Sequence, residues 1–302
     1  MGVITTGSTP KLLWPGINKI FGLAYDEYQP QWKACFETRN SDKAYEEVVA
    51  MSGMGLATVK GQGDSLGFDE MKQQFVARFT NVAYAIGYEI THEEIKDVQY
   101  AQFAEERTRN LVFSMHQTKE NVAANIFNRA FDGTYTGGDG VSLVNASHPT
   151  EGGTLSNTLT VAADLSEASL EDALIDISNF RDSRNNHISI KGQALLVPPQ
   201  LMMEATRIVE NPDRPATADR DINAIYKMNL LPRGVVVNQY LTDTDAWFVL
   251  TNAMSSLIHF QREERMIDTD NDFRTKNMLV SAFERYAFNW ADWRGIYGSE
   301  GA

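Results

Sequence analysis

Residues 97–131 read DVQYAQFAEERTRNLVFSMHQTKENVAANIFNRAF and carry the strongest structural signal in the chain. Apolar side chains recur there mostly at spacings of three or four, at Val98, Ala101, Ala104, Leu111, Met115, Val122, Ile126 and Ala130. This spacing predicts an amphipathic helix whose other face holds Glu105, Lys119 and Glu120. Asp132-Gly133 is a suitable C-terminal stop. At 1.5 Å per residue the helix would span about 50 Å, which indicates a structural spine.

The preceding segment, residues 41–90, has the pattern of a long β-hairpin. Residues 45–51 form a β-prone run, and residues 74–90 alternate between large apolar and smaller or polar side chains. Such alternation predicts a strand with one buried face, roughly 50 Å long. A glycine-dense stretch joins the two arms and contains Lys60. Because an isolated hairpin is marginal in water, we expect it to lean on another surface, such as a neighbouring subunit.

Residues 1–40 do not resemble a separate domain, since glycine and proline punctuate them between apolar anchors. They fit either an arm lying on another surface or a segment packed on its own core. Residues 1–8 lack the features of a signal peptide. No stretch of about 18 apolar residues occurs, so no transmembrane helix is expected.

Beyond residue 132 the sequence predicts a glycine-rich loop at 133–157 and then a mixed α/β portion. Residues 165–184 form a second amphipathic pattern, entered at Ser166 or Ser169. The remaining predicted elements are a strand at 194–197, a helix at 201–209, an exposed loop at 211–220, strands at 235–240 and 247–251, and a long strand at 272–290. This mixture of helices and strands predicts an α+β fold.

Composition limits the possible functions. The chain has 302 residues, 43% of them hydrophobic, which is enough for a substantial core. Cys35 is its only cysteine, so an intrachain disulfide and a multi-cysteine metal site are excluded. The net charge of -13 argues against gripping phosphate backbones or anionic lipid.

The sequence offers four weak chemical motifs, and each fails on spacing. Gly61–Gly67 resembles a dinucleotide fingerprint, but its third glycine is one place late and no strand leads directly into a helix there. Asp268–Asp272 lacks the glycine and glutamate of a calcium loop and is expected to be an acidic turn between strands. His92-Glu93-Glu94 lacks the second histidine of a zinc-protease helix, and Cys35 has only distant histidines. We therefore expect no catalytic, cofactor-binding or metal-binding residues, and a protein that is not an enzyme.

A resemblance to a known family rests on the glycine-rich loop and one later strand. The residues that carry it are Phe131-Asp132-Gly133, Gly138-Asp139-Gly140-Val141-Ser142-Leu143, Ser147-His148-Pro149, Gly152-Gly153 and Leu195-Leu196-Val197-Pro198-Pro199. These residues resemble a segment of the major head proteins of Mu-like and related phages. The order of elements resembles tailed-phage major capsid proteins of the Hong Kong 97-type fold.

The resemblance implies a subunit with an N-terminal arm (1–40) and an extended hairpin loop (41–90). A peripheral domain would comprise residues 91–165 and 252–302, with the spine helix at 97–131, and an axial domain residues 166–251. Some members crosslink through a lysine of the extended loop. No motif carries that role to Lys60, for which an ion pair or solubility is favoured.

The resemblance further implies that copies form hexamers and pentamers of an icosahedral head around double-stranded DNA, without sequence-specific binding. The protein would be made and assembled in the cytoplasm of a bacterial host and reside in the virion capsid, next to a portal. Because the hairpin starts near residue 41, we expect a separate scaffolding protein. Two alternatives stay open: an encapsulin-like nanocompartment shell, and an acidic cytoplasmic enzyme of α+β type.

Overall fold

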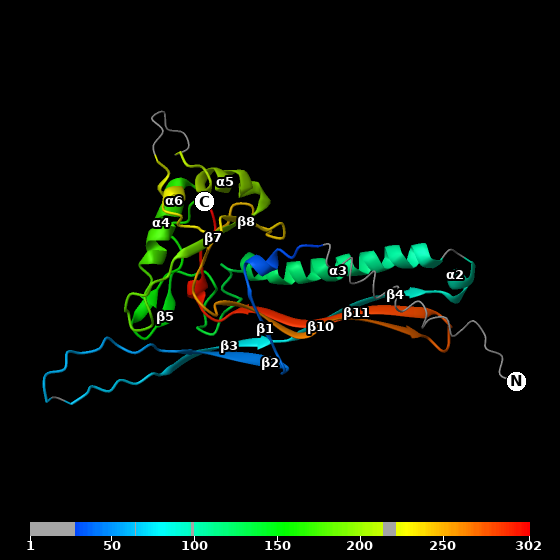
Figure 1. Cartoon of the computed structure of the whole chain (residues 1–302), viewed down its shortest axis with the longest axis horizontal. Helices are drawn as coiled ribbons and strands as arrows, with labels where there is room; N and C mark the ends of the chain where they lie inside the picture. Colours follow the sequence, from blue (N-terminus) through cyan, green and yellow to red (C-terminus); the bar gives the residue numbers. More distant parts are fainter. Residues whose placement is uncertain (1–27, 64, 98–99, 214–221) are drawn as a thin grey trace.

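The computed structural model describes residues 28–63, 65–97, 100–213 and 222–302. Figure 1 shows an elongated subunit in which a long sheet lies along helix α3 and a more compact body stands at one end of that sheet. A β-hairpin projects beyond both parts. The α+β mixture is the one that the sequence predicts.

The long sheet has the strand order β1-β10-β11-β4. Its centre is formed by β10 (Leu257–Asn271) and β11 (Met278–Trp290), which pair antiparallel. One edge is β4 (Val82–Ile90), antiparallel to β11, and the other is the short β1 (Glu37–Asn40), parallel to β10. Much of β11 alternates between buried and less buried side chains, because alternate residues of a strand face opposite sides of the sheet.

Helix α3 (Tyr100–Asn128) contacts β4 and β11 and is the predicted spine. Its limits differ from the predicted 97–131. A separate helix α2 (His92–Asp97) precedes it, and residues 98–99 lie outside the described part of the chain. At the other end α3 stops at Asn128, because the next N–H groups bond in tighter turns, for example Ala130 N to Phe127 O at 3.0 Å.

The compact body contains a second sheet, in the order β12-β9-β7-β8. Its strands are β12 (Ile296–Ser299), β9 (Trp247–Thr251), β7 (Gly192–Val197) and β8 (Val235–Val237). Alternate residues of β7 and β9 enter two different hydrophobic cores, so these central strands are buried on both faces. This explains their nearly continuous apolar sequence. The predicted strands 194–197 and 247–251 are confirmed, whereas the predicted 235–240 ends at Val237.

Three helices pack around this second sheet. Helix α4 (Glu167–Ser178) begins at Ser166, whose side chain accepts the Ser169 N–H while Ser169 caps the Ser166 backbone in return. The predicted start is confirmed, but the helix ends six residues before Arg184. Helix α5 (Met202–Val209) follows the 3-10 turn η3 (Pro199–Leu201) and confirms the helix predicted at 201–209. A short α6 (Ala224–Lys227) completes the set. Most of the loop predicted at 211–220 lies outside the described residues.

The hairpin consists of β2 (Tyr45–Met51) and β3 (Gln73–Thr80). The single strand predicted at 74–90 is wrong, because β3 pairs with β2 whereas β4 joins the long sheet. The change occurs at Asn81, whose side-chain amide donates to Ser41 Oγ at 2.8 Å and to the Lys43 carbonyl at 3.0 Å. Alternation continues through both strands, so periodicity alone does not reveal the change of partner.

The C-terminal quarter also differs from its prediction. The strand expected at 272–290 begins only at Met278, since residues 272–277 form the turn that joins β10 to β11. Asp268 belongs to β10 and not to an acidic turn. Neither β10 nor β12 was predicted, because charged residues such as Arg262 and Glu264 break the apolar alternation of β10.

Residues 28–40 pack on their own subunit. Of the two possibilities that the sequence left open for this segment, an arm on another surface or a segment on its own core, the second holds for these residues. Trp32, in the 3-10 turn η2 (Trp32–Ala34), and Phe36 are buried against α3 and β11. The N–H groups of Gln31 and Trp32 donate to the Glu120 carboxylate, at 2.7 and 3.1 Å. Residues 1–27, the rest of the predicted arm, lie outside the described residues.

A buried polar cluster lies between α3 and the long sheet. Lys119 and Glu120, expected on the solvent face of the helix, are 4% and 0% exposed. Lys119 Nζ lies 2.5 Å from Glu284 Oε1 and also donates to Gln261 Oε1 at 2.8 Å. Short β1 and η2 close this part of the sheet, so the helix is buried on more sides than its apolar stripe predicts.

His259 extends this cluster and should make the subunit sensitive to acid. Its ring lies 4.4 Å from both the Trp32 and the Phe288 ring, and burial, with Lys119 and Lys33 nearby, lowers its pKa to about 3. The unfolded chain binds this proton near pH 6.5, whereas the folded chain does not until about pH 3. Between these values each unit of falling pH should cost about 1.4 kcal/mol of unfolding free energy.

Urea titrations of unassembled subunits at pH 7, 6 and 5 check this prediction. The variant His259→Phe retains an aromatic ring without the titrating nitrogen, so its unfolding free energy should fall less steeply with pH. The difference between the two slopes of unfolding free energy against pH should approach the value for one proton, about 1.4 kcal/mol per pH unit. Equal slopes in the two proteins would mean that His259 does not set the acid sensitivity.

Candidate assembly surfaces

The stem of the hairpin packs on the face of the long sheet that is opposite α3. Ala77 and Phe79 of β3 are buried, and the Phe79 ring meets Phe260 of β10 edge-on at 5.0 Å. Ile258 and Ala287 complete this small core. The hairpin therefore leaves the sheet from a fixed apolar base.

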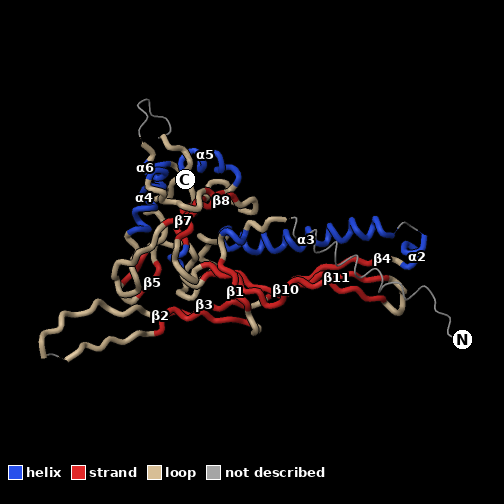
Figure 2. The backbone as a smooth tube through the Cα atoms, viewed as in Figure 1, coloured by secondary structure: helices blue, strands red, loops and turns tan. Residues whose placement is uncertain are grey.

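In the described part of the hairpin tip, residues 53–63 and 65–71, no comparable apolar base is present. Figure 2 draws most of this segment as loop, projecting away from the body. It nevertheless carries a series of exposed large apolar side chains: Met54, Leu56, Val59, Leu66, Phe68 and Met71. Leu56 is 83% exposed and Phe68 96%. A series of large exposed apolar side chains is typical of a surface that meets a partner.

Exposed apolar side chains also occur in the stem. There Tyr45, Val49 and Met51 of β2 are exposed, and the Arg78 guanidinium lies 3.8 Å from the centre of the Tyr45 ring. We call these exposed apolar residues of the tip and of β2 together the hairpin strip. Sequence analysis noted the glycines and Lys60 of the tip but missed its apolar residues. Their signal was the occurrence of large apolar side chains where no periodicity assigns them to a core.

A groove of about 580 Å³ lies between the C-terminal half of α3 and the loop that follows it. Val122 and Ile126 of the helix line one side, and Tyr135 and Trp290 line the other. Arg129 stacks on Tyr135 at 4.3 Å. The groove combines aromatic and aliphatic side chains with polar ones, among them Asn125, Thr134 and Asn289, so it suits a segment that carries both kinds of side chain.

The glycine-rich motif that carried the family resemblance has a structural role. His148 is buried, with Nδ1 2.6 Å from Asp139 Oδ2 and Nε2 3.1 Å from Asn157 Oδ1, and its ring stacks on Trp293 at 4.4 Å. Asn157 Nδ2 in turn donates to the carbonyls of Leu143, Trp293 and Ile296. The motif thus joins the loop to the C-terminal segment.

Two glycines of the motif allow the hairpin to approach this loop. A Cβ on Gly138 would lie 2.8 Å from the Val76 carbonyl oxygen of β3, and one on Gly137 would lie 2.6 Å from Trp290 Nε1. Any side chain at these positions would push the stem or the tryptophan away. The sequence motif therefore specifies the position of the hairpin base.

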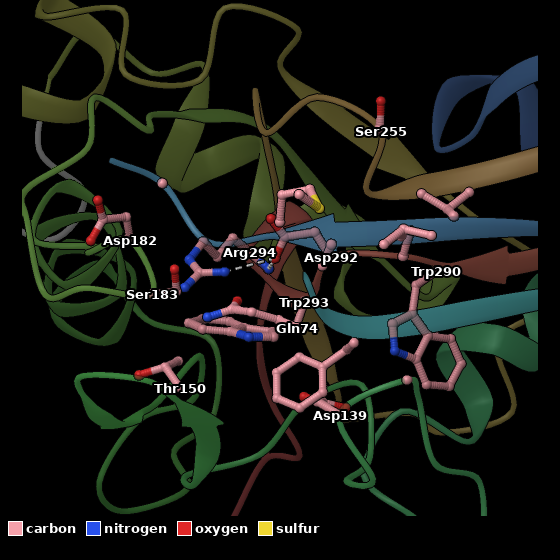
Figure 3. Close-up of a pocket in the computed structure, with 18 of the residues that line it drawn as sticks. Gln74, Asp139, Thr150, Asp182, Ser183, Ser255, Trp290, Asp292, Trp293 and Arg294 are labelled. Carbon is pink, nitrogen blue, oxygen red and sulfur yellow. Dashed lines mark hydrogen bonds and ion pairs between the residues drawn. The ribbon is translucent and has the colours of Figure 1, made fainter. Parts of the chain in front are cut away.

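A cleft of about 400 Å³ lies between the hairpin stem and the body (Figure 3). Its main charged groups are already bonded to neighbours. Asp139 contacts His148, Asp182 accepts the N–H groups of Arg184 and Asn186, and Asp292 accepts from Arg294 at 3.2 Å. These carboxylates stabilise turns. The cleft is therefore the boundary along which the hairpin stem packs beside the body.

The remaining residues singled out from the sequence lie apart from this cleft. Burial raises the pKa of the Cys35 thiol to about 12, which leaves the thiol unreactive at neutral pH. Lys60 is exposed in the hairpin tip. The backbone N–H of His92 donates to Asn277 Oδ1 at 3.1 Å. Within the described ranges, no three His, Cys, Asp or Glu side chains are grouped as a metal site.

In the part of the chain that the structure describes, no helix is both long and apolar enough to cross a membrane.

Comparisons with known structures extend the resemblance in fold to nearly the whole chain. A virus-like particle from Pyrococcus furiosus matches with a TM-score of 0.52 at 11% identity, over 94% of this chain and 97% of that chain. The procapsid of bacteriophage JBD30 matches with 0.53 at 13% identity, over 97% and 75%. A phage-related protein from Bordetella bronchiseptica matches with 0.54 at 10% identity, over 93% and 95%. These similarities establish a Hong Kong 97-type fold.

No curated protein matches the sequence. A family model described as phage capsid protein matches residues 77–299, which is well over half of the chain. The matched region begins in β3 and includes α3, the glycine-rich motif, the second sheet and the long sheet apart from β1. This chain therefore belongs to the phage capsid protein family.

Proposed function

We propose that this chain is the major capsid protein of a tailed phage, whose copies form hexamers and pentamers of an icosahedral head around double-stranded DNA. The observation that supports this most is the hairpin strip, whose apolar side chains are exposed in the single subunit. Covering them with another copy would contribute about 25 cal/mol per Å² of apolar surface removed from water. The same contact repeats in every subunit, so modest contacts add up to a stable shell.

The groove beside α3 is the surface we propose for receiving the tip of a second copy. It lies beside the C-terminal half of the spine and is lined by apolar and polar side chains, whereas the tip projects away from α3. A subunit that offers both surfaces cannot easily fill its own groove with its own tip. Such unlike surfaces join head to tail and close into rings.

We propose four functional parts, as the family resemblance implies. Residues 1–40 begin the chain as an N-terminal arm, although residues 28–40 pack on the body. Residues 41–90 form the extended loop, with β4 shared with the long sheet. Residues 91–165 and 252–302 form the peripheral domain, and residues 166–251 the axial domain.

Partners follow from the same proposal. We expect a separate scaffolding protein and a portal, and DNA enclosed without sequence-specific contacts. The net charge of -13 supports a wall that does not bind the packaged polymer tightly. Synthesis and assembly would take place in the cytoplasm of a bacterial host.

Electron microscopy of the expressed chain tests the proposal. We expect closed shells with five- and six-fold capsomers when the chain is produced with its scaffolding protein, and irregular or few particles without it. A compact monomer or dimer under all conditions, with turnover of a substrate, would overturn the proposal in favour of an enzyme. Uniform heads from the purified chain alone would exclude the need for scaffolding.

A second candidate is a nanocompartment shell that encloses protein, which the similarity in fold to the virus-like particle from Pyrococcus furiosus supports. Producing the chain together with a portal protein distinguishes a phage head from a nanocompartment shell. Incorporation of a portal at one vertex is expected for a phage head. Closed shells that exclude the portal and contain protein would favour the compartment.

A further inference from the structure

The loop at residues 181–187 is built to present one arginine to the hairpin. Asp182 Oδ1 accepts the N–H groups of Arg184 and Asn186, both at 2.8 Å, and Asp182 Oδ2 accepts the Asn186 side-chain amide at 3.0 Å. Asn185 adopts a left-handed backbone with φ of 70°. These bonds fix the direction in which the Arg184 side chain leaves the body.

Arg184 contacts the returning arm of the hairpin just before β3 begins. Its Nη1 lies 2.5 Å from Asp69 Oδ2, and its Nη2 donates to the Glu70 carbonyl at 2.5 Å. Its Nε lies 3.8 Å from Glu151 Oε2, on the turn between strands β5 (His148–Thr150) and β6 (Gly153–Leu155). The Arg184 side chain is only 18% exposed, so this guanidinium fork is held on several sides.

Asp69 also connects the two arms of the hairpin beyond the end of the β2–β3 ladder. The Gly55 N–H of the outgoing arm donates to Asp69 Oδ2 at 2.6 Å. A Cβ on Gly55 would lie 3.2 Å from that same oxygen and 3.5 Å from Arg184 Nη1, so a larger residue would crowd the contact. One carboxylate therefore holds both arms and attaches them to the body.

Beside the exposed ion pair of Lys72 with Glu151, at 3.5 Å, two attachments of different chemistry hold the hairpin. The apolar contact of Phe79 with Phe260 fixes the stem, and Arg184 fixes the start of the tip. The cleft of about 400 Å³ lies between the stem and the body. The apolar attachment is buried, whereas Asp69 is 44% exposed, so water and salt reach the second attachment.

We propose that Arg184 is a positioning residue for assembly: its bonds to Asp69 and Glu70 hold the tip, residues 53–63 and 65–71, at the angle needed to meet a second copy. This inference rests on the proposed function and identifies what controls its docking surface. Without Arg184 the tip remains apolar but samples many directions, so fewer encounters between subunits are productive.

The arrangement also gives the contact a dependence on solution conditions. The N–H groups of Gly55 and Glu70, together with Arg184, lower the pKa of the Asp69 carboxyl. The contact is therefore complete above the ordinary pKa of aspartate and is lost as the pH falls through the lowered value. High salt weakens it at neutral pH.

Hydrogen exchange of unassembled subunits tests the contact itself. In Arg184→Ala the amide of Gly55 should exchange about tenfold faster than in the unmodified chain. Arg184→Lys retains the charge without the fork and should give an intermediate rate. The control Arg207→Ala removes an exposed arginine paired with Glu204, far along the chain from the hairpin, and should leave Gly55 unchanged. Equal Gly55 rates in Arg184→Ala and the control would overturn the proposal.

Assembly then tests positioning. The subunit concentration at which half of the chain enters particles should rise about tenfold in Arg184→Ala, less in Arg184→Lys and not in Arg207→Ala. Faster exchange with unchanged assembly would also overturn the proposal, because the contact would then not position anything. These assembly measurements include the scaffolding protein. If the unmodified chain forms no particles even then, the proposed function fails, whereas the exchange experiment still decides whether the contact exists.

Discussion

Leu56→Asp combined with Phe68→Asp is expected to abolish shell formation while leaving the subunit folded. Both side chains are almost fully exposed in the isolated subunit, so a carboxylate costs nothing there. In an assembled shell each would be covered, and a buried side chain of this size contributes roughly 1.5–3 kcal/mol. Burying an unpaired carboxylate instead adds a penalty at every copy of the contact.

Particle counts by electron microscopy measure the effect, and the thermal midpoint of unassembled subunits verifies folding. Leu56→Met combined with Phe68→Met is the matched control, because it changes the same positions and keeps them apolar. The control should assemble within about threefold of the unmodified chain. Normal particles from the aspartate variant would mean that the tip is not an assembly surface.

Much of the framework was predictable, because its signals are local. Residues 100–128 show helical spacing over many turns, and Ser166 with Ser169 has the pattern of a capping box. The strands at 194–197 and 247–251 were found because burial on both faces leaves short apolar runs. A local pattern determines such elements whatever lies around them.

The pairing of strands was not predictable, because it depends on distant residues. Residues 74–90 alternate throughout, yet β3 pairs with a strand thirty residues earlier in sequence and β4 with one near the C-terminus. β10 escaped detection because its second half is at the sheet surface and carries both charged and apolar residues. The period of two indicates a strand but not its partner.

In the candidate surfaces, too, local motifs were recognised from the sequence, whereas contacts between distant residues were not. The glycine motif was recognised as a family signature, although only the structure shows that Gly138 makes room for β3 and that His148 ties the loop to Trp293. Arg184 carried no signal at all, since its partner Asp69 is 115 residues away. Contacts at that separation follow from the fold and not from any local pattern.

Lys119 and Glu120 show most clearly what local patterns cannot predict. Because both are charged, they were predicted on the solvent face of α3, whereas both are buried. Charged residues in an amphipathic pattern ordinarily face water. Here Lys119 is enclosed by the rings of Trp32 and Tyr286, at 5.1 and 4.7 Å from its Nζ, and by Glu284 and Gln261. Residues from three distant segments build this environment.

Lys119→Met should therefore destabilise the unassembled subunit by about 3–5 kcal/mol, because it leaves the Glu284 carboxylate buried without a cation. Glu284 is 3% exposed, and in the described structure its Oε1 otherwise receives only the Gln261 amide, at 3.0 Å. Methionine has nearly the same shape as lysine, so lost packing contributes little to the expected loss. Urea denaturation at pH 7 measures the free energy of unfolding.

The double variant Lys119→Met with Glu284→Leu separates the charge from the packing. Removing both charges removes the uncompensated carboxylate, and the double variant should recover most of the stability lost in the single one. A single variant that loses less than about 1 kcal/mol would mean that the pair is solvated in solution. A double variant no more stable than Lys119→Met would mean that Glu284 is stabilised by other groups. The expected recovery would show that the ion pair is needed only because each of its members is buried, and that the spine and the long sheet could be joined by apolar contacts alone.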